Sequence, residues 1–352
     1  MNTKNIFKTF FLCLSVISLS FTLNAQDLKP LRLGVAGVSH GHLHEVLIRL
    51  ERGDFEIVGV AEPDEQLRVN NPLRKKVDSS LFYADLEEML DKTKPEAVVA
   101  YGSIYDHLAI VEACAPRGIH VMARLARENN TLLLTNYETT WYDTNHEAYR
   151  LIKNENAIGK INRIEVYDGH EGPIEIGCGK EFTDWLTDPK LNGGGAVIDF
   201  GCYGANLVTW LMNGERPKSV YAILKQLKPD KYPKVDDDAT ILVEYPSATV
   251  QIMGSWNWPK GRKDMHIYGS EGYIYQDTPG SMRVYTHRKE KTTLPPKLKE
   301  PYNDSFYYLK AAVRKEIQVQ PYDLSSLENN LIVVEILESA IKSAKSGKPV
   351  RF

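Results

Sequence analysis

Residues 31–42 read Leu-Arg-Leu-Gly-Val-Ala-Gly-Val-Ser-His-Gly-His, an apolar run that ends in a glycine-containing turn. The run over 31–36 predicts a buried strand. Four leucine and valine residues then follow at the spacing i, i+3, i+4, i+7 and predict one face of a helix that stops at Gly53: Leu43, Val46, Leu47 and Leu50. Such a strand, turn and helix can hold a dinucleotide phosphate on the free N–H groups of the helix start.

The same alternation of strand and helix continues to about residue 140. Strands are predicted at 55–61, 97–101, 120–122 and 132–135, and helices open at Asp85 and near Asp106. Regular alternation predicts βαβ units, so we expect a doubly wound parallel sheet over 30–140.

The character of the sequence changes beyond Trp141. Several β-rich runs separated by short turns predict a mostly antiparallel sheet, and an amphipathic helix is expected at about 325–346. We therefore expect an α+β domain over 141–352 that serves substrate binding and oligomerisation. The last helix is a candidate to pack back on the first domain.

The first 25 residues have the composition of a secretory signal peptide. Lys4 and Lys8 precede an apolar run from Phe10 to Phe21, which closes on Leu23-Asn24-Ala25. The alternative, a membrane anchor, would need about 20 apolar residues to span a bilayer. We therefore expect a periplasmic or secreted protein without a stable membrane anchor.

Composition excludes several classes of protein. Of the 352 residues 25% are charged and 43% are hydrophobic, which argues against disorder and against a polytopic membrane protein. The net charge of −3 gives no reason to expect nucleic acid as a partner. Only three cysteines lie beyond the leader, an odd number that permits at most one disulfide and is expected to pack as free thiols: Cys114, Cys178 and Cys202.

An acid at the end of the second strand strengthens the dinucleotide prediction. Gly37 is the first glycine of a G-x-G-x-x-G pattern, whose other two places hold Ser39 and His42. Glu62 follows Gly37 by about 25 residues, where a carboxylate accepts hydrogen bonds from the adenosine ribose hydroxyls. Because it would repel a 2′-phosphate, NAD is favoured over NADP. The alternative is an exposed acid that begins the turn at Pro63.

The histidines of the first turn invite a metal interpretation. His40, His42 and His44 carry imidazole, the commonest zinc ligand. Their spacing of i, i+2, i+4 across a loop-to-helix junction does not place them on one face. We therefore expect them to line the phosphate turn and predict no metal site.

A second motif covers 192–206, Asn-Gly-Gly-Gly-Ala-Val-Ile-Asp-Phe-Gly-Cys-Tyr-Gly-Ala-Asn. Asp199 and Tyr203 are four residues apart, so they share a face if the segment from Gly195 is helical. A carboxylate paired with a phenol can relay a proton from a substrate hydroxyl while the carbon loses a hydride. The alternative is a capped helix start with a buried tyrosine.

Together these features resemble the glucose-fructose oxidoreductase / inositol dehydrogenase / MocA (Gfo/Idh/MocA) family, as does the stretch Asn-Tyr-Glu-Thr-Thr-Trp at 136–141. The resemblance implies a Rossmann domain and an NAD(P)-dependent dehydrogenase or reductase acting on a sugar, polyol or related alcohol, assembled as a homo-oligomer through the second-domain sheet. It assigns catalysis to Asp199 and Tyr203. The cofactor residues that it implies are Gly37, Ser39, His40, Gly41, Glu62, Ser103 and His107. The substrate candidates are His170, Trp185 and Asn206, the last standing where many members have an aspartate.

One departure from the family concerns the segment after Met122. Members usually continue this strand into Glu-Lys-Pro, whose lysine lies between nicotinamide and substrate, whereas here Ala123 follows and the crossover is shorter than the usual 10–12 or more residues. The chain is therefore predicted to bind its ligands but to turn substrate over weakly or not at all. Lys180, Lys260 or Lys263 are candidates to approach the site. Two other functions remain open: an NAD-dependent redox-neutral glycosidase and a non-catalytic nucleotide- or sugar-binding protein.

Overall fold

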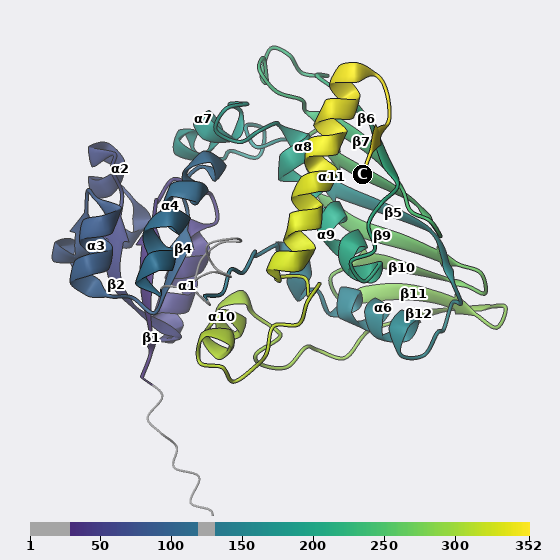
Figure 1. The fold of residues 1–352 in the computed structure, drawn as a ribbon, viewed down its shortest axis with the longest axis horizontal. Helices are drawn as coiled ribbons and strands as arrows, with labels where there is room; N and C mark the ends of the chain where they lie inside the picture. The colour runs from purple at the N-terminus through teal and green to yellow at the C-terminus, as the bar shows by residue number, and fades with distance from the viewer. Residues whose placement is uncertain (1–28, 119–130) are drawn as a thin grey trace, which may run out of the picture.

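A computed structural model describes residues 29–118 and 131–352. Figure 1 shows a small α/β domain beside a larger domain built on one broad sheet. The predicted signal peptide at 1–25, the strand at 120–122 and the shortened crossover after Met122 lie outside the described residues. Within the described ranges, no helix is long and apolar enough to cross a membrane.

The first domain contains a parallel sheet with the strand order β3-β2-β1-β4. This is the order of the first half of a dinucleotide-binding domain, so the predicted doubly wound architecture is confirmed. The strands are β1 (Leu31–Ala36), β2 (Phe55–Ala61), β3 (Phe82–Tyr83) and β4 (Ala97–Ala100). Their helices are α1 (Leu43–Arg52), α2 (Glu65–Val69), α3 (Leu86–Thr93) and α4 (His107–Cys114).

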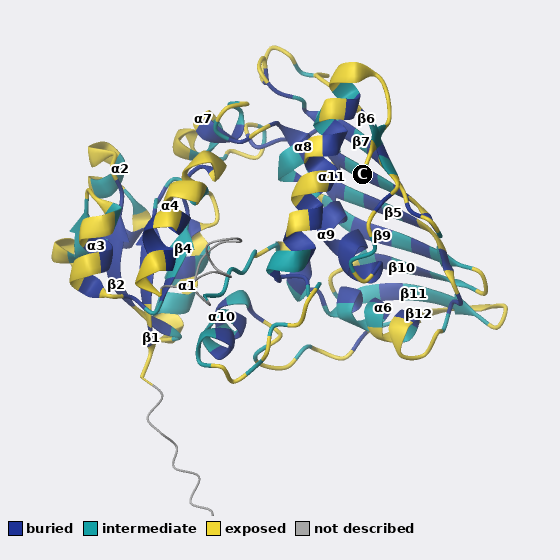
Figure 2. Ribbon diagram, viewed as in Figure 1, coloured by how far each residue is buried: buried dark blue, intermediate teal, exposed yellow. Residues whose placement is uncertain are grey.

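Helices cover both faces of this sheet, as Figure 2 shows by the dark blue of its strands. Leu43 and Val46 of α1 pack on one face, and Met89 of α3 with Ile110 of α4 pack on the other. The predicted helix signals are confirmed as well. Gly53 ends α1 in the left-handed conformation with φ 78°, and the Asp85 carboxylate accepts a hydrogen bond of 2.7 Å from the Glu88 N–H at the start of α3.

The strand predicted at 132–135 is not formed. The Thr135 N–H donates instead to the carbonyl of Ser325, at 3.1 Å, and β4 is the edge strand among the described residues. A further parallel strand would need a crossover of about a dozen residues.

The second domain contains a nine-stranded sheet with the order β12-β11-β10-β9-β5-β8-β7-β6-β13. β5 and β8 are parallel and the other pairs are antiparallel, as predicted. The strands are β5 (Ile161–Gly169), β6 (Ser219–Lys225), β7 (Asp238–Glu244), β8 (Thr249–Ser255), β9 (Arg262–Gly269), β10 (Tyr273–Thr278), β11 (Ser281–Thr286), β12 (Lys289–Thr293) and β13 (Val350–Arg351).

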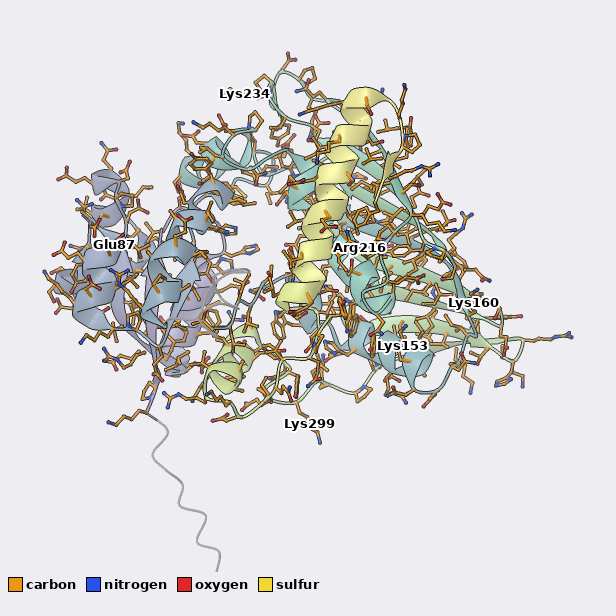
Figure 3. All side chains as sticks on the ribbon, viewed as in Figure 1. Glu87, Lys153, Lys160, Arg216, Lys234 and Lys299 are labelled. Atoms are coloured by element: carbon orange, nitrogen blue, oxygen red, sulfur yellow. The ribbon has the colours of Figure 1, made fainter. Side chains whose placement is uncertain are left out.

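Helices cover one face of this sheet and leave the other face open (Figure 1). The covering helices are α6 (Asp143–Lys153), α9 (Gly201–Leu211) and α11 (Leu327–Ser346). The last helix, α11, buries Val333, Ile336 and Ala340 in the core of the second domain. Arg216, labelled in Figure 3, forms an ion pair with Glu335 of this helix.

The expectation that the last helix packs back on the first domain is therefore corrected. α10 (Ser305–Val313) makes that contact, because its Phe306 stacks on Phe55 with 5.0 Å between ring centroids. The Asp304 carboxylate at its start lies 2.9 Å from the Arg49 guanidinium of α1. The apolar face of α11 packs on the large sheet. β13, which follows α11 in the chain, pairs with β6 of the same sheet and holds the helix there.

Candidate active site

The turn after β1 is held by close backbone contacts. Gly37 has φ +80° and donates its N–H to the carbonyl of Ala61 at 2.8 Å. A Cβ atom at this position would lie 2.5 Å from the Gly102 nitrogen, so only glycine fits. The His40 N–H donates to the carbonyl of Tyr101 at 2.9 Å. The turn thus rests on the carboxyl ends of both neighbouring strands, the position at which open α/β sheets bind ligands.

Glu62 is buried at 5% exposure, so the alternative of an exposed turn acid is wrong. Its two carboxylate oxygens accept hydrogen bonds from the Val38 N–H, at 3.0 Å, and from the Asp64 N–H, at 2.9 Å. Burial raises the pKa of this carboxyl above its usual value, although both hydrogen bonds oppose the shift. An ionised carboxylate has about four acceptor sites, so two remain for ribose hydroxyls.

Substituting Glu62→Gln is expected to destabilise the chain by about 1–3 kcal/mol, because the amide NH₂ would face one of two backbone donors. Urea unfolding at neutral pH measures this loss, and the same variant is expected to bind NAD more weakly. Glu65→Gln is the control, since Glu65 is exposed in the first turn of α2. An unfolding midpoint of E62Q equal to that of the wild type would contradict this account of Glu62.

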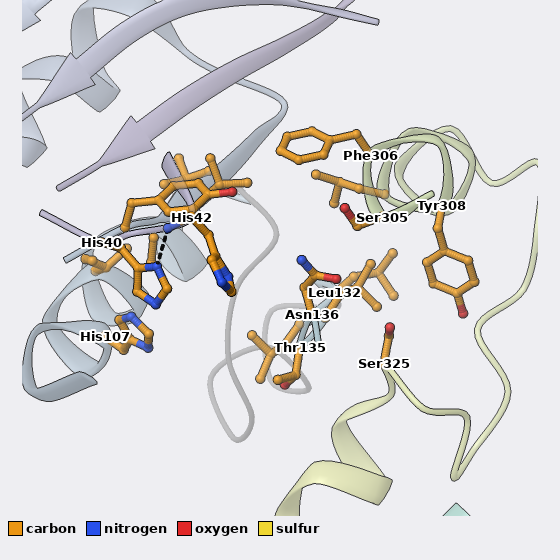
Figure 4. A pocket seen from close by; sticks show the side chains of 18 of the residues that line it. His40, His42, His107, Leu132, Thr135, Asn136, Ser305, Phe306, Tyr308 and Ser325 are labelled. Carbon is orange, nitrogen blue, oxygen red and sulfur yellow. Dashed lines mark hydrogen bonds between the residues drawn. The ribbon is translucent and has the colours of Figure 1, made fainter. Parts of the chain in front are cut away.

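The histidines line the turn, as predicted. The His40 Nδ1 accepts a hydrogen bond of 3.1 Å from the His42 N–H, so the neutral ring carries its proton on Nε2 (dashed in Figure 4). Burial, with smaller contributions from His42 and His107, lowers the pKa of His40 to about 3. The His44 Nδ1 donates to the carbonyl of Gly41 at 2.9 Å. Across 29–118 and 131–352, no group of three or more His, Cys, Asp or Glu side chains could hold a metal ion.

A cavity of about 330 Å³ lies between this turn, β4 and α10 (Figure 4). His40, His42 and His107 lie on one wall, and Ser305 and Tyr308 lie on the opposite wall. The Nε2 atom of His107 is buried and has no hydrogen-bond partner within 29–118 and 131–352. Ser103 is also buried, and its hydroxyl donates to the Asp106 carboxylate at 2.6 Å. An unpartnered imidazole nitrogen in a cavity is available to a polar ligand.

The glycine-rich motif is fixed by Asp236, which sequence reasoning missed. Its carboxylate accepts hydrogen bonds from the Gly195 N–H, at 2.9 Å, and from the Val197 N–H, at 2.7 Å. It thereby caps α8 (Ala196–Asp199). A Cβ atom at Gly195 would lie 1.8 Å from the carbonyl oxygen of Asp236, which explains the glycine.

Asp199 and Tyr203 belong to two helices rather than one, because the helical conformation is interrupted at Phe200, between α8 and α9 (Gly201–Leu211). The Asp199 carboxylate accepts a hydrogen bond of 2.8 Å from the indole N–H of Trp256, which is fully buried. Burial raises the pKa of Asp199 to about 6. Asp199 therefore titrates close to neutral pH, as suits a group that exchanges protons.

The Tyr203 side chain is 9% exposed and its ring lies between two aromatic rings. Ring centroids are 5.9 Å apart to Phe200 and 5.6 Å apart to Tyr137. Burial raises the pKa of its phenol well above the usual value, with further contributions from Cys202 and nearby carboxylates. The alternative interpretation of the 192–206 motif, a capped helix start with a buried tyrosine, describes the packing of Tyr203 correctly. Proton transfer also needs a neighbouring acid and a cation, and Asp199 and a lysine lie beside the ring.

Among the three candidate lysines, only Lys263 contacts these residues in the described part of the chain. Its Nζ lies 4.9 Å from the centroid of the Tyr203 ring and forms an ion pair with Glu138. Lys180 pairs with Asp184, and its side chain is 82% exposed on α7 (Lys180–Leu186). Lys260 is exposed.

Two of the three substrate candidates lie beside this cluster. The ring of His170 meets Phe200 edge-on at 4.9 Å, and its Nδ1 accepts the Gly172 N–H at 2.9 Å. The ring of Trp185 lies 5.5 Å from the ring of His40, and its buried indole N–H has no partner among the residues that the structure describes.

Asn206 is not brought to the site. It is fully buried, and its amide donates to the carbonyl of Leu324 at 2.8 Å and to the Asn330 side chain at 3.1 Å. These bonds join α9 to the start of α11. Its expected role in substrate contact is therefore corrected to a structural one.

The three cysteines beyond the predicted leader are free thiols, as expected.

Comparisons with known proteins agree with this architecture. Residues 146–275 match the GFO/IDH/MocA C-terminal domain. The trans-1,2-dihydrobenzene-1,2-diol dehydrogenase of Xenopus laevis is 25% identical over 319 residues, 82% of this chain and 90% of that protein.

Two solved structures share the fold over 92% of this chain. One is the aldose-aldose oxidoreductase from Caulobacter crescentus complexed with glycerol, with a TM-score of 0.76, 16% identity and 100% of that chain covered. The other is an inositol dehydrogenase homolog from Azotobacter vinelandii complexed with NADH and myo-inositol, with a TM-score of 0.75, 16% identity and 98% covered.

The fold and these matches define a two-domain protein with a dinucleotide-type first domain, similar over most of its length to oxidoreductases. The resemblance to the Gfo/Idh/MocA oxidoreductases is confirmed, and residues 146–275 match the C-terminal domain of that family.

Proposed function

We propose that this chain is an NAD-dependent dehydrogenase that oxidises one hydroxyl of a vicinal diol in a sugar or polyol. The observation that carries the proposal is the cluster of Asp199, Tyr203 and Lys263, whose Lys263 lies close enough to His42 of the phosphate turn for its charge to act on that histidine. The proteins that this chain resembles bind or act on compounds with neighbouring hydroxyls, namely a dihydrobenzenediol, glycerol and myo-inositol.

The described residues fit a dinucleotide in one respect. The buried Nε2 of His107 and Nε1 of Trp185 have no hydrogen-bond partner among the described residues and are available to a polar ligand. We assign the phosphates to the turn around Gly37, Ser39, His40 and Gly41, the ribose to Glu62, and the nicotinamide side to Ser103 and His107. A carboxylate at Glu62 favours NAD over NADP.

The bound nicotinamide would supply the hydride acceptor. The chain itself moves the proton: the Tyr203 hydroxyl, as phenolate, takes the proton of the substrate hydroxyl as the C–H bond gives up its hydride and a carbonyl forms. Asp199, with a pKa of about 6, is placed to hydrogen-bond a neighbouring hydroxyl or to pass the proton onward. His170 and Trp185 supply ring faces beside the sugar. Because the Glu-Lys-Pro lysine of the family is absent from the sequence, we propose slow turnover with binding retained.

The open face of the large sheet supports a homo-oligomer. Tyrosine rings stack along it, with 4.9 Å between the centroids of Tyr273 and Tyr285 and 4.5 Å between those of Tyr273 and Tyr275. Leu242 on β7 and Ile223 on β6 are also exposed, at 40% and 46%. Exposed aromatic and apolar side chains on an uncovered sheet face are typical of protein–protein interfaces. We propose that two copies pair through this face outside the cytoplasm, after removal of residues 1–25.

Native mass spectrometry of the exported chain tests cofactor and assembly together. We expect the mass of a dimer or tetramer that begins near Gln26, with one NAD retained per chain. A monomer would contradict the assignment of the open sheet face as an interface. A chain that takes up no dinucleotide, even when NAD is added in excess, would contradict the proposed function.

A further inference from the structure

Lys263 and Asp168 face each other across two strands. They form a cross-strand pair between β9 and β5, so both side chains project from the same sheet face. That face is the one covered by α9, because Val166 on β5 and Met265 on β9, each two residues away, are buried in the core there. Asp168 is 1% exposed, and both of its carboxyl oxygens are buried without a hydrogen-bond partner in the described part of the chain. A buried carboxyl of this kind requires a compensating charge or a proton.

Three groups surround the ammonium of Lys263. Glu138, from the short helix η5 (Glu138–Trp141), forms the ion pair, and its second oxygen accepts the Tyr142 hydroxyl. The ring of Tyr203 lies on a second side, and Asp168 occupies the facing strand. A flexible lysine can exchange one partner for another without moving the backbone.

We propose that Lys263 is the positioning residue of this active site, whose ammonium stabilises the phenolate of Tyr203 and so performs the task of the lysine that the chain lacks after Met122. The inference rests on the proposed function. It differs from the family pattern, because the cation comes from a strand of the second domain rather than from the first domain.

Electrostatics give the sign of the effect. An opposite charge within about 4–6 Å favours the ionised form by about 1–3 pKa units. Burial and the charges of Cys202, Asp199, Glu138 and Asp168 raise the pKa of the Tyr203 phenol, so a nearby cation lowers the pH at which the phenolate forms. The titratable groups that act on Tyr203 are Cys202 on α9, Asp199 on α8, Glu138 on η5 and Asp168 on β5. Lys263 acts in turn on Asp168, His42 and His170, and Asp264 and Arg262 on β9 also act on Asp168.

The pH dependence of kcat tests the proposal. With Lys263→Met, the pH at which the rate reaches half its plateau is expected to rise by about 1–2 units, because the phenolate loses its counter-ion. Lys263→Arg should restore most of the wild-type profile. Glu138→Gln, which removes the competing carboxylate, should shift the profile in the opposite direction. Lys260→Met is the matched control, since Lys260 is exposed three residues away. An unchanged profile in K263M would overturn the inference.

A second measurement does not depend on activity. The NMR signal of ¹³C-labelled tyrosine, with the Tyr203 resonance assigned from the Tyr203→Phe variant, reports ionisation of this phenol directly. In K263M its titration should move to higher pH than in the wild type and in K263R. A wild-type chain that forms no NADH would count against the proposed function alone, because the titration still decides on Lys263. A Tyr203 titration that is unmoved by K263M would overturn the inference whatever the activity.

Discussion

Replacing Tyr203 with phenylalanine is expected to lower kcat by about 10²–10⁴-fold, the usual contribution of a positioned acid or base. The ring packing against Phe200 and Tyr137 is kept, so the loss should fall on the proton transfer rather than on the fold. NAD affinity should be unchanged, because the cofactor residues lie on the other domain. Initial rates of NADH formation and a separate NAD titration measure the two quantities.

Tyr137→Phe is the matched control for that substitution. Tyr137 lies beside Tyr203 and is partly buried, yet it has no assigned role in proton transfer. Its removal should leave kcat within a few-fold of the wild type. Equal activity of Y203F and wild type would show that Tyr203 is only a packing residue, as the alternative interpretation of the motif holds.

Replacing Gly195 with alanine is expected to destabilise the chain by about 3 kcal/mol or more, enough to prevent folding in a marginally stable protein. The added Cβ would collide with the backbone carbonyl of Asp236, so the segment must shift and lose the hydrogen bonds from the Gly195 and Val197 N–H groups. Urea unfolding, or the yield of soluble protein where the variant does not fold, measures the loss.

Gly280→Ala is the control for the glycine. No atom lies within 4 Å of a Cβ built at Gly280, so its effect should stay within about 0.5–1 kcal/mol. A G195A variant that unfolds at the wild-type urea concentration would contradict the assignment of Gly195 and Asp236 as the support of α8.

Local signals in the sequence predicted most of the fold. Some elements depend only on neighbours within a few residues in the sequence, and these form as predicted. They are the strands at 31–36 and 55–61 and the helix end at Gly53. The hairpins of β10 to β12 were missed because tyrosine and charged side chains on the open face obscure the alternation. α11 was misplaced because periodicity tells which face is apolar but not which surface covers it.

The site was predictable only where its residues share one motif. Asp199 and Tyr203 lie within 192–206 and were identified together. The interruption of the helix at Phe200, between them, was not predicted. Asp236, Trp256 and Asp168 reach the same place from distant strands and loops, and no local pattern marks them. Lys263 was one lysine among three, and the strand pairing with Asp168 distinguishes it. Asn206 was misassigned because a helix motif does not reveal that its far side faces α11.

The central claim is that this chain transfers a hydride from a vicinal diol to NAD while Tyr203 takes the proton of the substrate hydroxyl. The most direct measurement is the NADH absorbance that develops when the exported chain, supplied with NAD, is offered myo-inositol, glycerol and simple aldoses, in parallel with the Y203F variant. The account predicts NADH formation in the wild type, slower than the roughly 10 s⁻¹ of a median enzyme, and none above background in Y203F. Bound NAD with no NADH from any diol, or release of sugar from an aryl glycoside without net NADH, would contradict it.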